Sequence, residues 1–276
     1  MKKTILITGA NGMFGSEACE LFSKWNYEVI AAKKSDLDVA NFSAVQKFFS
    51  EKKIDFVIHA AAYTKVDAAE SNRDLAFLIN SEGAKNIALA TKEKSIPLIF
   101  ISTDYVFDGE KGDVYFPSDK TNPINIYGAS KLAGEENIRT INPQHYIVRT
   151  SWLYGKNGKN FVDTMLALSK KQQEIKVVDD QFGCPTWTYD LALGIEKLIE
   201  EKKPFGTYQI CGGGITNWYK FAKKIFEILK INVEVIPVKT SEFPRPAKRP
   251  KFSAMNNARL CRNWQEGLTD YLTQRH

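Results

Sequence analysis

The chain has 276 residues, of which 43% are hydrophobic and 25% are charged, and its formal net charge is +6. This composition is typical of a globular protein, and the length exceeds that of one small domain. The positive charge is spread along lysine-rich surfaces without an aromatic and basic recognition module, so we expect no nucleic-acid partner. The sequence lacks a signal peptide and an apolar run of roughly 18 residues, so we expect a cytoplasmic protein without a membrane partner.

Short β-branched runs alternate with amphipathic segments over residues 1–150. This alternation is typical of βαβ units, whose right-handed crossovers build a doubly wound parallel sheet. The expected fold class is therefore α/β. The pattern predicts strands near 3–8, 27–32, 54–60, 97–103 and 145–150, and helices over 14–25, 42–53, 72–93 and 124–140.

A glycine-rich turn lies between the first predicted strand and the first predicted helix. Gly9, Gly12 and Gly15 follow the apolar run at residues 5–7. Glycine permits a tight turn, lets the backbone approach a pyrophosphate and lets the helix pack closely on the sheet. The N-terminus of the helix adds partial positive charge. The position of this turn directly after a strand predicts a dinucleotide site.

Two lysines follow the second predicted strand. Folds that use NAD place a carboxylate there to bind the ribose hydroxyls of the adenosine, whereas this chain has Lys33 and then Lys34. A lysine can offer a charge-assisted hydrogen bond to a 2′-phosphate. We therefore expect NADPH to be favoured over NADH, with two solvated lysines on a loop as the alternative interpretation.

Tyr127 and Lys131 are four residues apart, so on a helix they share one face. A tyrosine of ordinary pKa, ~10, is a poor acid-base catalyst at neutral pH. A lysine ammonium one turn away is expected to lower that pKa by favouring the phenolate. Thr103 lies at the end of the fourth predicted strand, and its hydroxyl can form a hydrogen bond with the substrate oxygen on which Tyr127 would act. The three residues predict acid-base chemistry beside the dinucleotide.

After Arg149 the alternation becomes less regular. The spacing predicts helices at 160–171, 187–203 and 216–230, with short strands near 174–178, 206–211 and 233–236. We expect a dinucleotide-binding Rossmann domain over 1–150, and a smaller, mainly substrate-binding region over 151–276 that returns some segments to the sheet. Prolines and basic residues at 244–250 predict an extended cationic loop, which is either a surface linker or an anion-binding lid.

Five segments are more particular than these general signals. They read AAAYTKVDAAE at 60–70, STDYVFDG at 102–109, YGASKLAGE at 127–135, RTSWLYG at 149–155 and DQFGCPT at 180–186. In this order they resemble the dTDP-4-dehydrorhamnose reductase family of extended short-chain dehydrogenases/reductases, over nearly the whole chain. Pro117 departs from the family pattern, because an acidic residue is usual at that place.

The resemblance implies reduction of a nucleotide-linked keto sugar with hydride from a reduced nicotinamide. The residue matching Tyr127 gives a proton to the C4 carbonyl oxygen, the residue matching Lys131 holds the nicotinamide ribose, and the residue matching Thr103 binds the reacting oxygen. The implied reaction converts dTDP-4-dehydro-L-rhamnose to dTDP-L-rhamnose with NADPH. Members of the family often accept both cofactors, so NADH stays an alternative.

The resemblance also implies a set of binding residues. On the substrate side it implies Asp104, Trp152 and Asn160, together with Thr103. On the cofactor side the expected residues border the pyrophosphate turn, the adenine and the cofactor groove: Gly9, Gly12, Met13, Phe14, Gly15, Lys33, Asp38, Val39, Ala62, Tyr63, Thr64, Tyr127 and Lys131.

Two other functions stay open at this point. One is a reductase of a different nucleotide-linked keto sugar with the same catalytic residues, and the other is a non-catalytic, NADP-binding regulatory subunit of the same fold. The presence of Thr103, Tyr127 and Lys131 together argues against a pure binding subunit. The acidic residues show no metal-ligand grouping, so no metal site is expected. We expect a monomer or a homodimer.

Overall fold

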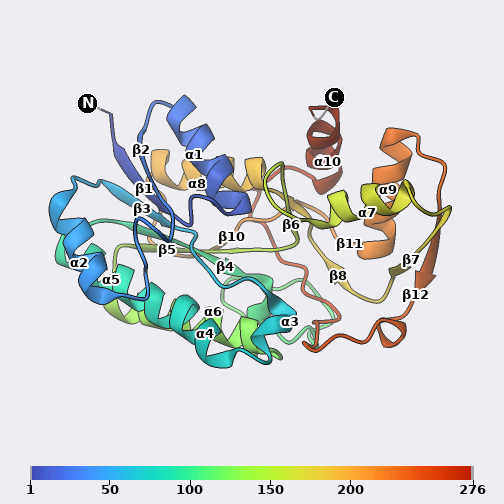
Figure 1. Ribbon diagram of the computed structural model, residues 1–276, viewed down its shortest axis with the longest axis horizontal. Coiled ribbons are helices and arrows are strands. Elements are labelled where there is room, and N and C mark those ends of the chain that lie inside the picture. The colour runs from blue at the N-terminus through green and yellow to red at the C-terminus, as the bar shows by residue number, and fades with distance from the viewer. Residues whose placement is uncertain (1, 275–276) are drawn as a thin grey trace.

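A computed structural model describes residues 2–274 of the chain. Its centre is a six-stranded sheet in the order β10-β5-β4-β3-β1-β2, in which all neighbouring strands are parallel (Figure 1). The predicted doubly wound α/β fold is confirmed. The sheet consists of β1 (Thr4–Thr8), β2 (Glu28–Ala32), β3 (Phe56–His59), β4 (Leu98–Thr103), β5 (His145–Thr150) and β10 (Gly206–Gln209).

Helices cover both faces of this sheet (Figure 1). On one face α1 (Met13–Lys24) packs against α8 (Thr188–Glu200), and their buried apolar side chains meet those of β1, β3 and β5. On the other face lie α2 (Phe42–Glu51), α5 (Gly83–Glu93) and α6 (Ile126–Ile141). β10 and α8 come from the second half of the sequence, so this half contributes to the same core.

The helix predicted over 72–93 is interrupted. The structure has α4 (Arg73–Phe77), a π-helical turn η1 (Leu78–Glu82) and then α5. Single π turns inside helices are often found at functional sites, because the extra residue re-aims side chains. Here the turn includes the buried side chains of Asn80 and Ser81.

The remainder of the chain builds a second core. Its apolar side chains come from α7 (Phe161–Ser169), β7 (Glu174–Val178), α9 (Trp218–Leu229), β12 (Glu234–Val238) and α10 (Trp264–Thr273). Short elements connect the two cores: α3 (Val66–Ala69), η2 (Asp104–Val106), β6 (Leu153–Tyr154), β8 (Phe182–Gly183), β9 (Thr186–Trp187), β11 (Thr216–Asn217) and η3 (Thr240–Glu242).

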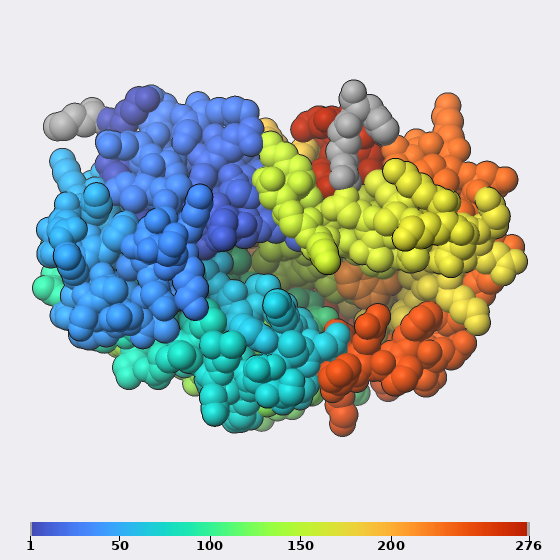
Figure 2. All heavy atoms as spheres, in the orientation of Figure 1, coloured from blue at the N-terminus to red at the C-terminus, as the bar shows by residue number. Residues whose placement is uncertain are grey.

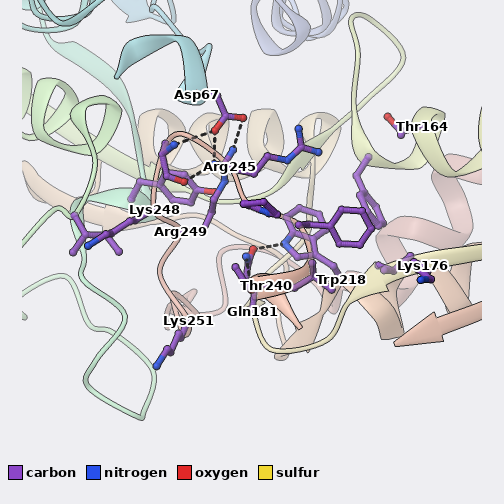
Figure 3. Close-up of a pocket in the computed structure, with 18 of the residues that line it drawn as sticks. Asp67, Thr164, Lys176, Gln181, Trp218, Thr240, Arg245, Lys248, Arg249 and Lys251 are labelled. Atoms are coloured by element: carbon purple, nitrogen blue, oxygen red, sulfur yellow. Dashed lines mark hydrogen bonds and ion pairs between the residues drawn. The ribbon is translucent and has the colours of Figure 1, made fainter. Parts of the chain in front are cut away.

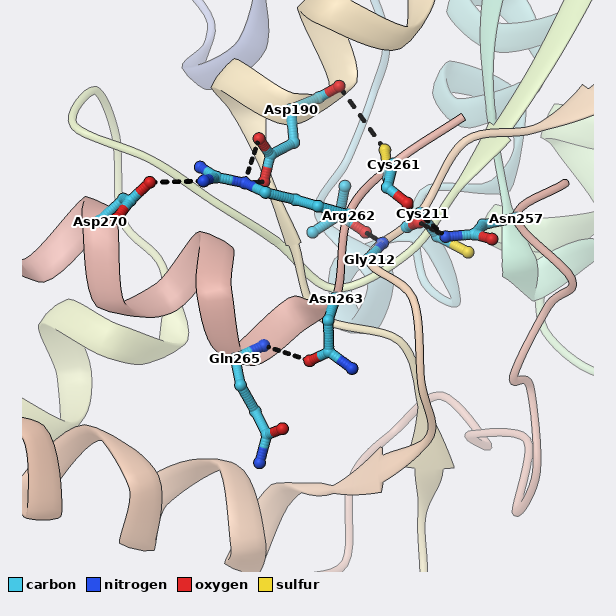
Figure 4. A network of polar contacts seen from close by, with 10 residues as sticks. Asp190, Cys211, Gly212, Asn257, Cys261, Arg262, Asn263, Gln265 and Asp270 are labelled. Carbon is cyan, nitrogen blue, oxygen red and sulfur yellow. Dashed lines mark hydrogen bonds and ion pairs between the residues drawn. The ribbon is translucent and has the colours of Figure 1, made fainter. Parts of the chain in front are cut away.

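A polar network anchors α10, which the sequence patterns did not predict (Figure 4). Arg262 donates from Nε to Asp190 Oδ1 at 3.0 Å and also pairs with Asp270. Asn257 donates to the carbonyl oxygens of Cys211 and Cys261 at 3.2 and 2.9 Å. These contacts join the segment before α10 to α8 and to the end of β10.

Within residues 2–274, no helix combines the length and the apolar character that crossing a membrane requires. In the same residues, no three His, Cys, Asp or Glu side chains are grouped as ligands for a metal ion.

Candidate active site

A cavity of about 480 Å³ opens at the carboxyl ends of β1, β3, β4 and β5. In Figure 2 the face of the molecule is hollowed between the blue-to-teal part and the yellow-to-orange part. Ligands of open α/β sheets bind at this edge. Most of the residues expected at the site line this cavity: Gly9, Gly12, Met13, Phe14, Gly15, Ala62, Thr64, Thr103, Asp104, Tyr127, Lys131 and Trp152.

The glycine-rich turn is closely packed. Gly9 has φ +66°, in the left-handed region that favours glycine, and a Cβ there would lie 2.7 Å from Ala61 Cα. A Cβ on Gly15 would lie 2.1 Å from the carbonyl oxygen of Gly9. The turn leads into α1, whose N-terminus begins at Met13 on the cavity wall. Bare backbone and unpaired helix N–H groups therefore face a cavity in which a pyrophosphate fits.

Five of the expected residues lie outside this cavity lining. Lys33 is exposed after β2, and its backbone N–H donates a hydrogen bond to Asp36 Oδ2 at 3.0 Å. Val39 is buried in the core behind β2, and its carbonyl oxygen accepts from Asn86 at 2.9 Å. Asp38, beside it, is partly buried.

Asn160 acts as a helix cap in this structure. Its Oδ1 accepts from the backbone N–H of Asp163 at 3.0 Å, and its Nδ2 donates to the carbonyl oxygen of Gly155 at 2.9 Å. Capping by asparagine satisfies backbone groups at the start of a helix, here α7. The structure therefore gives Asn160 a local role and does not bring it to the cavity.

Asn80 is a site residue that sequence reasoning missed. Its Oδ1 accepts from the backbone N–H of Tyr63 at 2.7 Å, and its Nδ2 donates to the Tyr63 carbonyl at 3.1 Å and to Ser130 Oγ at 2.9 Å. Asn80 thus fixes the backbone of the predicted cofactor groove relative to α6. The signal in the sequence is a polar residue on the apolar face of a predicted helix, but only the π turn explains how it reaches Tyr63.

Tyr127 and Lys131 lie one helical turn apart on α6, as predicted. The hydroxyl of Tyr127 forms a hydrogen bond with Thr103 at the end of β4. Burial raises the pKa of Tyr127 to about 12, although the hydrogen bond with Thr103 acts in the opposite direction. The expectation that Lys131 draws this pKa down is therefore wrong for the protein alone. At neutral pH Tyr127 is protonated, which is the state that can donate a proton.

The position of Lys131 explains this difference. Its side chain is only 2% exposed, and its Nζ lies 3.9 Å from the ring centre of Phe100. Burial lowers the pKa of Lys131 to about 7, while the charge of Glu135 acts the other way. Near neutral pH a large fraction of Lys131 is a neutral amine, which does not stabilise a phenolate.

A buried ion pair of Glu135 and Arg149 fixes α6 against the sheet. Glu135 accepts two hydrogen bonds from Arg149, at 3.0 Å from Nε and 2.8 Å from Nη2, and one from Ser102 Oγ at 2.6 Å. Arg149 also donates to the carbonyl oxygen of Pro117 at 3.2 Å. Pro117 therefore contributes its backbone at the place where the sequence departs from the family pattern. Arg149 and Ser102 thus tie α6, which carries Tyr127, to β5 and to β4, which ends at Thr103.

A second cavity of about 830 Å³ adjoins the first, and both are lined by Tyr105 and Trp218. Trp218 stacks on Trp152 with ring centres 3.5 Å apart. Basic side chains surround this second cavity, and Figure 3 shows several of them with the pair of Arg249 and Asp67. The basic lining residues are Lys176, Arg245, Lys248, Arg249 and Lys251.

The loop over 244–250 is part of that lining. Arg249 donates to both carboxylate oxygens of Asp67, from Nη2 to Oδ2 at 2.9 Å and from Nη1 to Oδ1 at 2.5 Å. Its guanidinium also forms a hydrogen bond with Tyr105. The contacts hold the loop against α3 on the lining of the second cavity, and its binding of an anion stays a prediction.

Known proteins are similar to this chain in sequence and in fold. The family model of the RmlD substrate binding domain matches residues 1–276. A dTDP-4-dehydrorhamnose reductase of Clostridium acetobutylicum ATCC 824 is 46% identical, with a TM-score of 0.96 and 99% of each chain covered. The dTDP-4-dehydrorhamnose reductase of Bacillus anthracis str. Ames, solved in complex with NADP, is 44% identical, with a TM-score of 0.96 over 99% of this chain and 100% of that chain.

A curated relative is similar over nearly the whole chain. The spore coat polysaccharide biosynthesis protein SpsK of Bacillus subtilis (strain 168) is 39% identical, over 98% of this chain and 97% of that protein. Together the family model and the full-length relatives confirm the resemblance first seen in the five sequence segments. The chain belongs to the dTDP-4-dehydrorhamnose reductase family.

Proposed function

We propose that the protein reduces the C4 keto group of dTDP-4-dehydro-L-rhamnose to give dTDP-L-rhamnose, with NADPH as the reductant. The observation that carries the proposal is the hydrogen-bonded pair of Thr103 and Tyr127, with Lys131 one turn away, beside a glycine-rich turn suited to a pyrophosphate. A cytoplasmic location fits a reaction that consumes NADPH and a nucleotide sugar, since neither crosses a membrane unaided.

The chain's own groups divide the chemistry between them. The turn of Gly9 and Gly15 would hold the pyrophosphate of NADPH and Lys131 would hold its ribose, and the bound cofactor would supply hydride for the C4 carbon of the sugar. Thr103 and Tyr127 place two hydroxyl groups where the carbonyl oxygen arrives. Tyr127 donates its proton to that oxygen as negative charge develops there. Its burial keeps it protonated until that moment.

The adjoining basic cavity supplies binding for the nucleotide. A dTDP group carries a diphosphate, and arginine and lysine side chains recognise phosphate by charge-assisted hydrogen bonds. Arg245, Lys248 and Arg249 line the cavity on the loop that closes it. The stacked rings of Trp152 and Trp218 form the wall between the two cavities, which suits the hydrophobic face of a deoxysugar.

A panel of nucleotide-linked keto sugars tests the substrate. We expect dTDP-4-dehydro-L-rhamnose to give the highest kcat/KM among dTDP-, GDP- and CDP-linked 4-keto-6-deoxyhexoses. Preference for a GDP- or CDP-linked sugar by more than about tenfold, a barrier difference of ~1.4 kcal/mol, would replace this substrate by that of a sibling reductase.

Lys33 is proposed to select NADPH. Its side chain is exposed directly after β2, and its backbone is fixed in a turn with Asp36 and Leu37. A charge-assisted hydrogen bond to a 2′-phosphate contributes about 1.5–3 kcal/mol, so the wild type should favour NADPH over NADH by roughly ten- to hundredfold in kcat/KM. Lys33→Asp should lower that ratio by about tenfold or more, because the carboxylate repels the phosphate.

The matched control is Lys34→Asp, which changes the net charge equally at the next position. It should alter the ratio less than Lys33→Asp does. Equal use of the two cofactors by the wild type, or an unchanged ratio in Lys33→Asp, would remove Lys33 from cofactor selection.

A further inference from the structure

Asp104 lies at the inner end of a chain of hydroxyl groups. Thr103 Oγ1 is 3.0 Å from Asp104 Oδ1, and Ser253 Oγ donates to Asp104 Oδ2 at 2.6 Å. Thr103 in turn forms the hydrogen bond with Tyr127, whose hydroxyl faces the cavity. A continuous path of hydrogen-bonding groups therefore runs from a carboxyl group to the proposed proton donor.

The carboxyl group of Asp104 is buried. Asp104 is 2% exposed, and among residues 2–274 no ion pair includes it. Burial raises the pKa of Asp104 to about 7, against the hydrogen bonds from Ser253 and Thr103. Its charge acts to raise the pKa values of Tyr105, Tyr127, Cys184 and Cys211, which are not cationic groups.

We propose that Asp104 is a positioning residue that returns a proton to Tyr127 through the hydroxyl of Thr103. This proposal rests on the proposed reductase function, and it gives Asp104 a role other than the sugar contact that the family resemblance implies. Ser253 holds the carboxyl group in place, because its own backbone N–H is bonded to the Phe182 carbonyl at 2.8 Å.

The transfer balances with one proton. The O–H bond of Tyr127 breaks as the new hydroxyl of the sugar forms. The Thr103 hydroxyl then gives its proton to the Tyr127 oxygen and takes the proton of the Asp104 carboxyl group, because a hydroxyl can donate and accept at once. Asp104 is left as a carboxylate and regains a proton from water after the product leaves. The two electrons of the reduction come with the hydride, and the proton transfers among Tyr127, Thr103 and Asp104 move none.

The protonation state of Asp104 can be measured in the free protein, without substrate or cofactor. Infrared difference spectra should show the C=O stretch of a protonated carboxyl group at pH 6, lost as the pH rises through about 7 and absent in Asp104→Asn. Ser253→Ala should move the midpoint of this loss to higher pH, because a donor to the carboxylate is removed. A wild-type carboxyl group already ionised at pH 6 would overturn the proposal, whether or not the protein is a reductase.

The second measurement is the pH profile of the steady-state kcat with NADPH and the dTDP-linked keto sugar, because only repeated turnover needs the proton of Tyr127 to be restored. The wild-type rate should fall as the pH rises through about 7, because only protonated Asp104 passes a proton. Asp104→Asn keeps hydrogen-bonding groups but has no proton to pass, so its rate at pH 6 should be about tenfold lower and nearly constant to pH 8.

Asp108→Asn is the matched control, since Asp108 lies just beyond the same strand end and bonds to Tyr115 and Asn122 outside the cavity. It should keep the wild-type profile. The pKa of Lys131 is also lowered to about 7, so the pH profile of Asp104→Asn decides whether Asp104 or Lys131 causes the fall in rate. If Asp104→Asn keeps the wild-type fall with the same midpoint, or the wild-type rate at pH 6, Asp104 does not return the proton.

Discussion

Tyr127→Phe should lower kcat by roughly 10²-fold or more, the scale of losing a positioned general acid. The variant lacks only the hydroxyl that bonds to Thr103, and the ring keeps its edge contact with Tyr105, 5.9 Å between centres. The fold and NADPH affinity should therefore change little. The measurements are steady-state kcat with the keto sugar, the NADPH dissociation constant and the thermal midpoint of unfolding.

A tyrosine elsewhere in the sheet serves as the control. Tyr146 in β5 donates from its hydroxyl to the Lys203 carbonyl at 2.6 Å, outside both cavities. Tyr146→Phe removes the same atom and should keep kcat within about twofold of the wild type, since it is not positioned for acid catalysis. Near wild-type turnover in Tyr127→Phe would show that another group donates the proton.

Glu135→Gln should destabilise the protein by about 3–5 kcal/mol, because it leaves the Arg149 guanidinium buried without its counter-charge. Both side chains are essentially inaccessible, at 0% and 2% exposure. Chemical denaturation at pH 7 measures the loss. The pair also ties α6 to β4 and β5. Glu135→Gln should therefore have a lower kcat than the wild type even at temperatures where the variant is still folded.

An exposed pair provides the comparison. Glu82 and Lys85 are 3.3 Å apart on the surface, with side chains 52% and 44% exposed. Glu82→Gln should change the free energy of unfolding by less than about 1 kcal/mol, because water screens such a pair. A loss below about 1 kcal/mol in Glu135→Gln as well would contradict the importance given to the buried pair.

The same pair gives stability a defined pH dependence. Burial alone would raise the pKa of Glu135, but the hydrogen bonds and charge of Arg149 outweigh it, and the pKa is lowered. A carboxyl group with a lowered folded-state pKa contributes stability that is present above its unfolded pKa and is lost as the pH falls through the folded value. The wild type should therefore lose this contribution below about pH 4, whereas Glu135→Gln should not.

Local sequence signals predicted the parts of the site that local structure creates. The glycine-rich turn follows a strand, and Tyr127 and Lys131 share a helical face, because spacing along one element decides both. Thr103 could be placed because parallel strands end at one edge of a sheet. The five β-strands of the first half could also be predicted, because each one is a short β-branched run.

Features that depend on tertiary contacts could not be predicted in this way. The π turn that aims Asn80 at Tyr63 is stabilised by packing between helices, and spacing in the sequence predicts only a continuous helix. The ion pair of Asp67 and Arg249 joins residues 182 apart. Burial sets the pKa values of Tyr127 and Lys131. Its effect is larger than the effect of the lysine charge on the tyrosine that their spacing predicts.

Catalytic turnover distinguishes a working reductase from a binding subunit of the same fold. The most direct test is to mix purified protein with NADPH and dTDP-4-dehydro-L-rhamnose and to follow the nicotinamide absorbance together with the sugar product. We expect NADPH to be oxidised in equal amount to the dTDP-L-rhamnose formed, with catalytic turnover. NADPH binding without oxidation, for this sugar and for every other keto sugar of the panel, would contradict the account.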